Sequence, residues 1–297
     1  MTFHQLNGDE ATKIFKFILP AKNIEEENIP KSWIQSITFI PNTYRLKQIE
    51  CGPCGLLAVL QAYMLAAIKF NPEYDSKQIL ICAVLEIMLK LRQSFAFCID
   101  FSLKTRNDVN PAQRYINLMI INSKEEAEYF LESNNYFDLE NAAFLLMISF
   151  AFLSGPKLLS SFASHETFIT MNGMTDVHFV YLLLTGKAVD IPCNECKILG
   201  GILHAGVINQ QQIGILQVED DNLSEPIGTY LTYPTYETWV VHYDGHFTSI
   251  VRKDNKFYEF DNFDKTEEEC RLIELDHFSH HILMDKLKNI ADYIDSH

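Results

Sequence analysis

The feature that most restricts how this chain can fold is an apolar run that begins at Cys54 and continues to Phe70. It follows Pro53, and proline is favoured in the first turn of a helix, where its missing N–H would have no partner anyway. Apolar side chains occupy almost every side of the helix that the run predicts, so most of this helix must be buried. The run is shorter than the roughly 18–20 apolar residues that cross a bilayer, which indicates a core helix.

Helical patterns fill most of the first half of the chain, and short β-branched or aromatic runs fill much of the second half. We expect helices over residues 9–19, 28–39, 54–70, 76–92, 125–132, 139–153, 176–184 and 276–294. We expect an antiparallel meander, turning at Asp244-Gly245 and Asp254-Asn255, with strands over residues 213–218, 238–244, 246–253 and 256–261. Helices first and strands later predict an α+β fold. Because no glycine- or proline-rich linker divides the chain, residues 1–297 are expected to form a single domain.

Charge and cysteine usage narrow the range of partners and compartments. Asp and Glu total 39 against 24 for Lys and Arg, which gives a formal net charge of −15. Such a chain does not suit nucleic acid or an anionic membrane, because their phosphates must be neutralised by cations. The acidic surplus serves either solubility or a partner with basic features. The N-terminus has no signal-peptide pattern, so we expect the cysteines to be reduced, in the cytoplasm or, as a second location, the nucleus.

The sequence CGPC at residues 51–54 has the spelling of a redox-active pair, and other uses of the two thiols compete with that one. A thioredoxin-like dithiol is disfavoured because the flanking residues differ and the chain is much longer than that domain. A zinc site shared with Cys193 and Cys196 is disfavoured because the two pairs lie far apart in the chain. Taken singly, Cys193 and Cys196 are expected to be thiols in a surface loop.

A third use of the segment needs only Cys54, as a nucleophile. At the start of a helix, unpaired N–H groups and the positive end of the helix dipole stabilise a thiolate. Attack on a carbonyl also needs a base and an oxyanion hole. Gln48 lies in the loop that leads to the helix. Its side-chain amide and the Cys54 backbone N–H are therefore candidates to bind the oxyanion, as in papain-like enzymes.

His246 is the candidate base, because it opens an expected strand directly after a tight turn and can face a cleft from there. The following strand ends at Asp261-Asn262, and either side chain is a candidate to orient the imidazole as the third member of a papain-like site. The sequence leaves this choice open. His242 is the rival base, because the alternation of side chains along one strand would put it on the same face as His246.

These residues carry a resemblance to a known family. Residues 48–62, QIECGPCGLLAVLQA, resemble the active-site segment of the MINDY deubiquitinases, whose motif is Gln-x3-Gly-Pro-Cys-Gly. Further blocks of that family, in the same order, are similar to residues 30–39, 181–189 and 239–251. Cys51 stands where glycine is common in the family, and Gly245 stands where serine is common. Residues 95–132 match none of these blocks.

The resemblance implies a papain-related cysteine peptidase that hydrolyses isopeptide bonds in polyubiquitin, with a preference for the linkage through lysine forty-eight of ubiquitin. It implies that Cys54 is the nucleophile and His246 the base. It also implies that Gln48 is the oxyanion donor and that Asp261 orients the imidazole. The implied partners are ubiquitin and polyubiquitin chains, and the acidic surplus suits the arginines of ubiquitin's C-terminal tail. Neither a metal nor an organic cofactor is required.

Two other functions remain open at this point. The first is a ubiquitin-binding module or scaffold of the same fold with little activity. The second is a dithiol oxidoreductase that uses Cys51 and Cys54. A milder form of the second is a reversible disulfide between Cys51 and Cys54 that switches the peptidase off under oxidation.

Overall fold

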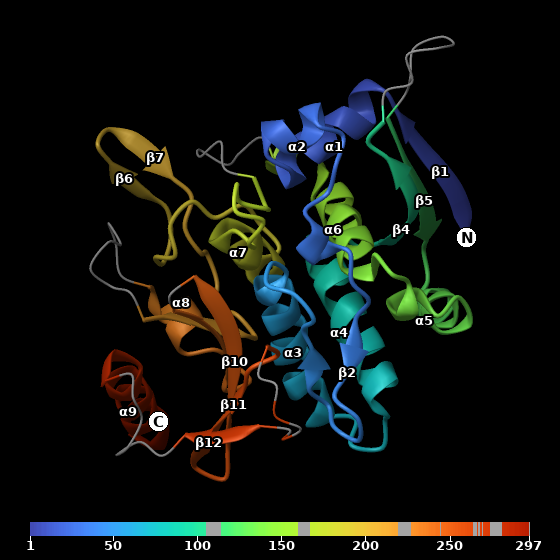
Figure 1. Cartoon of the computed structure of the whole chain (residues 1–297). Coiled ribbons are helices and arrows are strands. Elements are labelled where there is room, and N and C mark those ends of the chain that lie inside the picture. Colours follow the sequence, from blue (N-terminus) through green and yellow to red (C-terminus); the bar gives the residue numbers. More distant parts are fainter. Residues whose placement is uncertain are drawn as a thin grey trace.

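Helix α3 (Cys54–Ile68) forms the centre of the fold, as the sequence predicts, and every residue from Cys54 to Ala66 is buried. It packs against α4 (Ser76–Leu91), α7 (Val177–Thr185) and the strands β9 (Thr238–Tyr243) and β10 (His246–Lys253) (Figure 1). The structure is a computed structural model, and it describes residues 1–104, 114–159, 167–218, 227–243, 245–263, 266, 268, 270–273 and 281–296.

Most of the other predicted helices are present, with small shifts at their ends. Helix α4 begins where expected because Asp75 and Gln78 form a capping box, in which each side chain accepts from the other's backbone N–H. Helix α7 begins directly after Asp176, whose carboxylate accepts from the His178 N–H. The remaining predicted helices are α1 (Asp9–Ile18), α5 (Lys124–Ser133) and α6 (Ala142–Leu159). Two short helices are not predicted from the sequence, α2 (Ala21–Glu25) and α8 (Thr229–Thr232).

The helix expected over residues 28–39 is wrong. Only a short 3₁₀ turn, η1 (Lys31–Trp33), forms there, and the chain then extends into strand β2 (Thr38–Phe39). Trp33 is fully buried, and its indole N–H donates to the Gly173 carbonyl at 2.8 Å. Such long-range contacts outweigh the local preference for a helix, which amounts to less than about 1 kcal/mol per residue.

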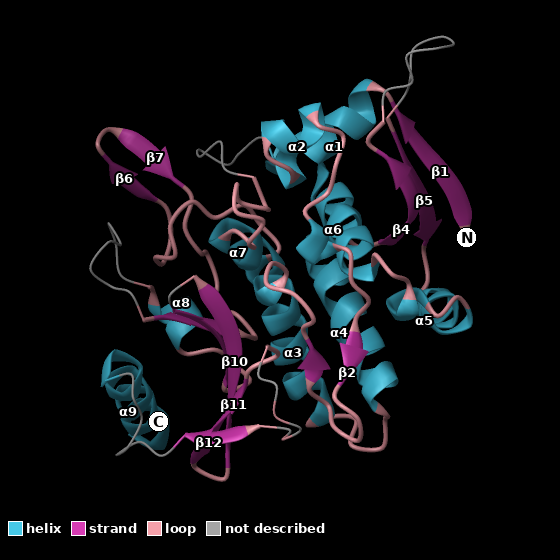
Figure 2. Cartoon of the chain, in the orientation of Figure 1, coloured by secondary structure: helices cyan, strands magenta, loops and turns pink. Residues whose placement is uncertain are grey.

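A three-stranded antiparallel sheet lies in the first half of the chain, which the sequence predicts to be mainly helical and where it predicts no strand. Its order is β1-β5-β4, made of β1 (Thr2–Asn7), β4 (Phe95–Ser102) and β5 (Tyr115–Ile121). Its strands β4 and β5, FAFCIDFS and YINLMII, are rich in the β-branched and aromatic residues that suit a half-buried sheet. Helix α6 packs on β4, and Figure 2 shows this sheet on the opposite side of the helices from β10.

A five-stranded sheet in the second half has the order β12-β11-β10-β9-β8. Besides β9 and β10, it contains β8 (Gly214–Gln217), β11 (Lys256–Phe260) and β12 (Arg271–Ile273). The predicted meander is confirmed for β9, β10 and β11, and β12 extends it. The prediction of an antiparallel arrangement is wrong for β8, which runs parallel to β9. The two strands are joined by a crossover connection that contains α8. Asp254 and Asn255 have φ of 52° and 59°, as a two-residue type I′ turn requires. Asp244 lies outside the described residues.

Helix α9 (His281–Ser296) covers the second sheet, with Leu283 and Leu287 in the same buried cluster as Trp239. It corresponds to the helix predicted over 276–294, of which residues 276–280 lie outside the described part. A separate hairpin, which the sequence does not predict, consists of β6 (Lys197–Leu199) and β7 (Ile202–His204). Within the described residues, none of the helices combines the length and the apolar character needed to cross a bilayer.

A buried glutamine ties α3 to the chain that precedes it. Gln61 Oε1 accepts from the Leu46 N–H at 2.8 Å, and its Nε2 donates to the Tyr44 carbonyl at 3.1 Å. Methionine has a similar volume but leaves both backbone groups unpaired, so we expect Gln61→Met to lower the free energy of unfolding by about 2–4 kcal/mol. Urea denaturation measures this loss. The control is Gln5→Met on the exposed edge of β1, expected to change stability by less than about 0.5 kcal/mol. Equal losses in the two variants would contradict the prediction.

Candidate active site

Cys54 is the first residue of α3, and a sharp turn leads the chain to it. Gly52 has φ of 148°, and a Cβ there would stand 2.5 Å from Ser32 Oγ, so the turn requires glycine. Pro53 occupies the N-cap position. Only 1% of Cys54 is exposed, and its Sγ lies 3.9 Å from the Gly52 carbonyl oxygen. Cys54 thus occupies the first turn of the helix, where the N–H groups have no intrahelical acceptor, as the sequence predicts.

His246 is the first residue of β10, and this strand is fixed against α3. Ser249 Oγ donates to the Ala58 carbonyl at 2.8 Å, which joins the strand to the helix. His246 Nε2 lies 2.9 Å from Asp261 Oδ1, and Cys54 is near enough to the imidazole to raise the pKa of His246. Because Asp261 occupies Nε2, Nδ1 is the ring nitrogen that remains for the thiol. The structure therefore brings Cys54, His246 and Asp261 together from three separate elements.

Of the two residues that the sequence leaves open as partners of His246, the structure pairs Asp261 with it. Asp261 follows β11, and its Oδ1 also accepts from the Phe263 N–H at 3.0 Å, which fixes the carboxylate. Asn262 is 2% exposed, and its side-chain nitrogen and oxygen have no hydrogen-bond partner in the described part of the chain. Its backbone carbonyl accepts from the Gln48 N–H at 2.8 Å instead.

The His246 imidazolium and the Asp261 carboxylate stabilise each other's charged form. Burial acts to lower the pKa of His246, but the interactions with Asp261 and Cys54 outweigh it and raise the pKa to about 9. Burial acts to raise the pKa of Asp261, but the hydrogen bonds from His246 and the Phe263 N–H, together with the Arg45 charge, hold that pKa below its usual value. At neutral pH, His246 is thus an imidazolium between a carboxylate and a thiol.

Gln48 lies between β3 (Leu46–Lys47), which pairs with β2, and the start of α3, and it is 6% exposed. Its Nε2 donates to the Glu50 carbonyl at 2.9 Å, which uses one of the two N–H groups of the amide. The other N–H remains for a ligand. The hydrogen bond from the Gln48 backbone to Asn262 holds this loop beside the strand end that carries Asp261.

His242, the rival base, has a different environment. The turn between β9 and β10 places His242 opposite Phe247 and His246 opposite Tyr243, so the prediction that both histidines share one face of one strand is wrong. The His242 ring stacks on Phe247, with 4.2 Å between the ring centroids. Burial is the main cause that lowers the pKa of His242 to about 4, so this ring is neutral at neutral pH. The Asp261 carboxylate is hydrogen-bonded to His246, so His246 is the histidine that the structure favours as the base.

The cysteine positions do not favour the dithiol or zinc alternatives. No disulfide joins the seven cysteines, all of which lie among the described residues. Cys51 is exposed whereas Cys54 is buried, so the two thiols have different environments. Cys196 is exposed as predicted, but Cys193 is only 2% exposed, so the prediction of a surface thiol is wrong for it. In the described part of the chain, no group of three or more His, Cys, Asp or Glu side chains is placed to bind a metal ion.

Two buried residues that donate hydrogen bonds to the backbone of the site are not predicted from the sequence. Arg45 is 2% exposed and donates to the Asp261 backbone carbonyl at 3.4 Å. Thr175 is 4% exposed and bonds to the turn before Cys54, from 123 positions further along the chain. Neither residue has a local pattern that connects it to Cys54, so only the folded structure reveals these contacts.

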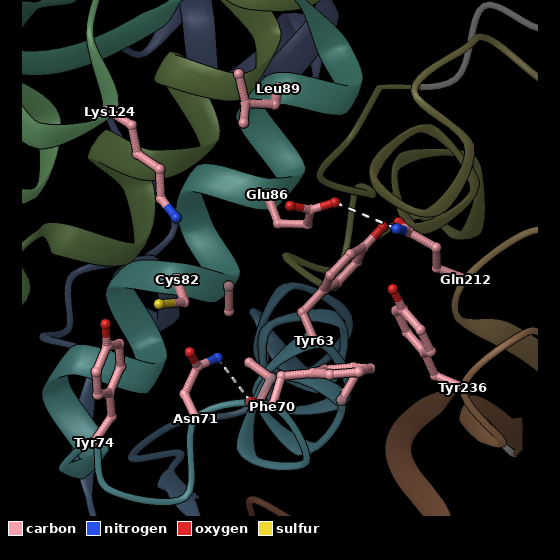
Figure 3. Close-up of a pocket in the computed structure, with 13 residues that line it drawn as sticks. Tyr63, Phe70, Asn71, Tyr74, Cys82, Glu86, Leu89, Lys124, Gln212 and Tyr236 are labelled. Carbon is pink, nitrogen blue, oxygen red and sulfur yellow. Dashed lines mark hydrogen bonds between the residues drawn. The ribbon is translucent and has the colours of Figure 1, made fainter.

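A separate pocket of about 200 Å³ opens between α3 and α4 (Figure 3). Glu86 Oε1 accepts from Gln212 Nε2 across it at 3.4 Å. Tyr63, which lines it, follows Cys54 by nine residues, a rise of about 14 Å along a helix. None of the residues that line this pocket belongs to the Cys54 site, so the two are distinct.

Comparison with known proteins points to one family. The family model described as "Deubiquitinating enzyme MINDY-3/4, conserved domain" matches residues 23–280. "Ubiquitin carboxyl-terminal hydrolase MINDY-3" of Xenopus tropicalis is 22% identical over 270 residues, which cover 77% of this chain and 61% of that protein. "Probable ubiquitin carboxyl-terminal hydrolase MINDY-4" of Xenopus tropicalis is 25% identical over 281 residues, 80% of this chain and 38% of that protein.

The human protein named "Probable ubiquitin carboxyl-terminal hydrolase MINDY-4" is 26% identical over 253 residues, 73% of this chain and 33% of that protein. The chain thus spans 61% of the length of the MINDY-3 relative and 33–38% of the length of the MINDY-4 relatives. No solved structure matches the chain. Because the family model covers most of its length, this chain belongs to the MINDY-3/4 family of deubiquitinating enzymes.

Proposed function

We propose that this chain is a cysteine deubiquitinase that hydrolyses isopeptide bonds in polyubiquitin. The observation that carries the proposal is the position of His246, which is hydrogen-bonded to Asp261 and lies near Cys54 at the start of a buried helix. A nucleophile on a helix and a base on an adjacent sheet form a papain-like arrangement. The family supplies the substrate class, because its relatives are named ubiquitin carboxyl-terminal hydrolases.

In the first half of the proposed reaction, the Cys54 thiolate attacks the carbonyl carbon of ubiquitin's C-terminal glycine. A C–S bond forms, and the carbonyl π electrons move to the oxygen. The backbone N–H of Cys54 and the remaining N–H of Gln48 Nε2 are the donors for this oxyanion. When the oxyanion collapses, the C–N bond breaks and the lysine amine leaves with the proton of the His246 imidazolium.

In the second half, water hydrolyses the thioester that joins ubiquitin to Cys54. The neutral His246 imidazole removes one proton from the attacking water as the water oxygen bonds to the carbonyl carbon. The C–S bond then breaks to give the thiolate and the carboxylic acid of ubiquitin, which loses the second proton of the water to solvent. The imidazolium and the thiolate are then restored for the next cycle. Asp261 keeps Nε2 of the ring occupied throughout, so Nδ1 remains directed at the reacting sulfur.

The proposal is tested by a ubiquitin probe that carries an electrophile at its C-terminus, followed by a panel of diubiquitins of every linkage. We expect the folded wild-type protein to form a covalent adduct with the probe. In the panel, we expect the chain linked through lysine forty-eight of ubiquitin to be cleaved fastest. A folded protein that binds polyubiquitin but neither reacts with the probe nor cleaves any chain would contradict the enzyme and favour a binding module.

The proposal extends to the organisation and the location of the protein. Residues 1–297 would act as one catalytic domain, which the contacts of α3 with β9 and β10 support because they join the nucleophile to the base. All seven cysteines are free of disulfides, which suits a reducing compartment, so the cytoplasm is proposed, with the nucleus as the second location.

Removing the side-chain amide of Gln48 tests the oxyanion hole. We expect Gln48→Ala to lower kcat by about 10²–10³ while KM stays nearly constant, because the donor acts on the transition state. Steady-state hydrolysis of a fluorogenic ubiquitin C-terminal amide measures both constants. Gln212→Ala, in the separate pocket, is the matched control and should retain wild-type kcat. A change in KM with unchanged kcat would show that Gln48 only binds substrate.

A further inference from the structure

Thr175 contacts the chain on both sides of the nucleophile. Its backbone N–H and its hydroxyl Oγ1 both donate to the Gly52 carbonyl oxygen, each at 2.8 Å. Its Oγ1 also accepts from the Gly55 N–H at 3.3 Å. A single side chain thus joins the turn that precedes Cys54 to the first turn of the helix that follows it. At 4% exposed, this side chain is shielded from water that would otherwise compete for these bonds.

The backbone around Thr175 is itself held firmly, so it can serve as a fixed support. The Phe168 N–H donates to the Phe17 carbonyl at 2.8 Å, at the end of α1. The Trp33 indole N–H donates to the Gly173 carbonyl at 2.8 Å. These bonds fix the segment 167–176 to elements that precede the nucleophile in the chain.

The packing of Thr175 explains a second glycine of the nucleophile segment. A Cβ on Gly55 would stand 2.7 Å from Thr175 Cγ2 and 2.9 Å from its Cβ, closer than side-chain atoms approach one another. Glycine at position 55 is therefore what allows the threonine to reach the Gly55 N–H. A Cβ on Gly52 would likewise stand 3.0 Å from the Gly173 carbonyl oxygen, so both glycines that flank the Pro53-Cys54 pair allow the chain to approach the supporting segment.

The hydrogen bonds of Thr175 have a consequence for the sulfur. The Gly52 carbonyl oxygen is also the acceptor of the Cys54 Sγ–H, at 3.9 Å. Both donors of Thr175 lie 2.8 Å from this oxygen, much closer than the sulfur, so they set the position of the carbonyl that Sγ contacts. If the hydroxyl donor is lost, this carbonyl and the turn that carries Cys54 are held from the Thr175 side by the backbone N–H alone.

We infer that Thr175 is a positioning residue for the nucleophile: its hydroxyl joins the turn at Gly52 to the start of α3 at Gly55 and so fixes the position of Cys54 between them. This inference deepens the proposed function and rests on it for the catalytic consequence. Thr175 touches neither the ubiquitin tail nor the reacting carbonyl in the proposed reaction, so it acts through Cys54. Serine at this position retains every hydrogen bond, whereas valine retains the shape and loses the hydroxyl.

The first test measures the thiol without ubiquitin. In a Cys51→Ser background, the tryptic peptide 48–69 contains Cys54 as its sole cysteine, so mass spectrometry follows its alkylation by iodoacetamide. We expect Thr175→Val to slow this alkylation about tenfold at pH 7, as the loss of one hydrogen bond that fixes the position of the thiol predicts. Thr175→Ser should stay within about threefold of the parent rate.

The second test measures catalysis. With the fluorogenic ubiquitin amide, Thr175→Val is expected to lower kcat about tenfold while KM stays within about twofold, and Thr175→Ser is expected to restore kcat. Thermal melting verifies that each variant is folded. If valine prevents folding, Thr175→Ala, which is smaller and relieves any contact with Gly55, replaces it with the same expected losses.

The two tests separate the inference from the proposed function. Alkylation of a folded Thr175→Val or Thr175→Ala variant at the parent rate overturns the positioning role, whatever the ubiquitin substrates show. Equal losses in the valine and serine variants also overturn it, because serine keeps the hydroxyl. If alkylation depends on the hydroxyl but the parent protein reacts with no ubiquitin probe, the positioning role stands and the proposed deubiquitinase function fails.

Discussion

Replacing Cys54 by alanine is expected to lower kcat for polyubiquitin by at least about 10³ and to abolish labelling by the ubiquitin probe. The reason is that the reaction proceeds through a bond to Sγ, and no other group in the described site is placed to form it. His246 would retain Asp261 but lose its reacting partner. The fold should be preserved, because alanine suits the start of a helix and removes one buried atom. Gel analysis of chain cleavage and of probe adducts measures both effects.

Cys51 provides the matched control, because it lies in the same short segment and is exposed. We expect Cys51→Ala to retain kcat within about twofold, since solvent-exposed substitutions away from the reacting atoms change little. Labelling of the Cys54→Ala variant, or loss of activity in Cys51→Ala, would contradict the single-thiol mechanism and favour a dithiol. Equal activity of wild type and Cys51→Ala after peroxide treatment would exclude the disulfide switch.

The elements that the sequence predicts correctly are those with strong local signals. Helix α3 is apolar on nearly every side, and α4 has a capping box at its start, so neither depends on distant residues for its assignment. The turn between β10 and β11 has two residues with positive φ, as its Asp-Asn sequence permits. In these places local preference and the tertiary fold agree.

The elements that are wrong depend on contacts between distant parts of the chain. Strand β1 lies at the N-terminus but pairs with β5, more than a hundred residues later. The segment 28–39 has a helix-start pattern, yet burial of Trp33 and pairing of β2 with β3 hold it extended. The direction of a strand also depends on distant contacts. A sequence pattern identifies β8 as a strand but does not show that it runs parallel to β9.

In the candidate site too, some residues are predicted by local sequence signals and others are revealed only by the fold. Cys54 and His246 follow from their positions at the start of a helix and of a strand. The choice between Asp261 and Asn262 needs the fold, because adjacent residues in a turn point in different directions that a sequence does not specify. Thr175 contributes through hydrogen bonds to a segment 123 positions away, so only the assembled structure shows its place in the site.

Replacing Asp261 by alanine is expected to lower kcat by about 10² at neutral pH, because both the orientation and the charge of His246 depend on it. Asparagine at this position separates the two contributions. Asp261→Asn keeps an oxygen acceptor for Nε2 and for the Phe263 N–H, so orientation is retained while the negative charge is lost. We therefore expect a smaller loss than with alanine, together with a changed pH profile, measured as kcat/KM between pH 5.5 and 10.

The direction of the pH change follows from the raised pKa of His246. The folded value is about 9 against an ordinary 6.5, so the interaction stabilises the protonated ring. This interaction contributes about 3 kcal/mol to the free energy of unfolding, shared between Asp261 and Cys54. The contribution is fully present below pH 6.5 and is lost as the pH rises to 9. Without the Asp261 charge the pKa of His246 falls toward 6.5. The alkaline limb of kcat/KM, near pH 9 in the wild type, should then move toward pH 7, because the ring loses the proton that the leaving amine needs.

Asn262→Ala is the matched control for both variants, because it alters the neighbouring side chain, which has no hydrogen-bond partner among the described residues. Its alkaline limb should remain near that of the wild type, since His246 keeps its carboxylate. If Asn262→Ala moves the limb and Asp261→Asn does not, Asn262 orients the ring in solution and the pairing with Asp261 is wrong. If neither variant moves it, the raised pKa of His246 comes from the Cys54 thiolate alone, and the site works as a cysteine–histidine pair.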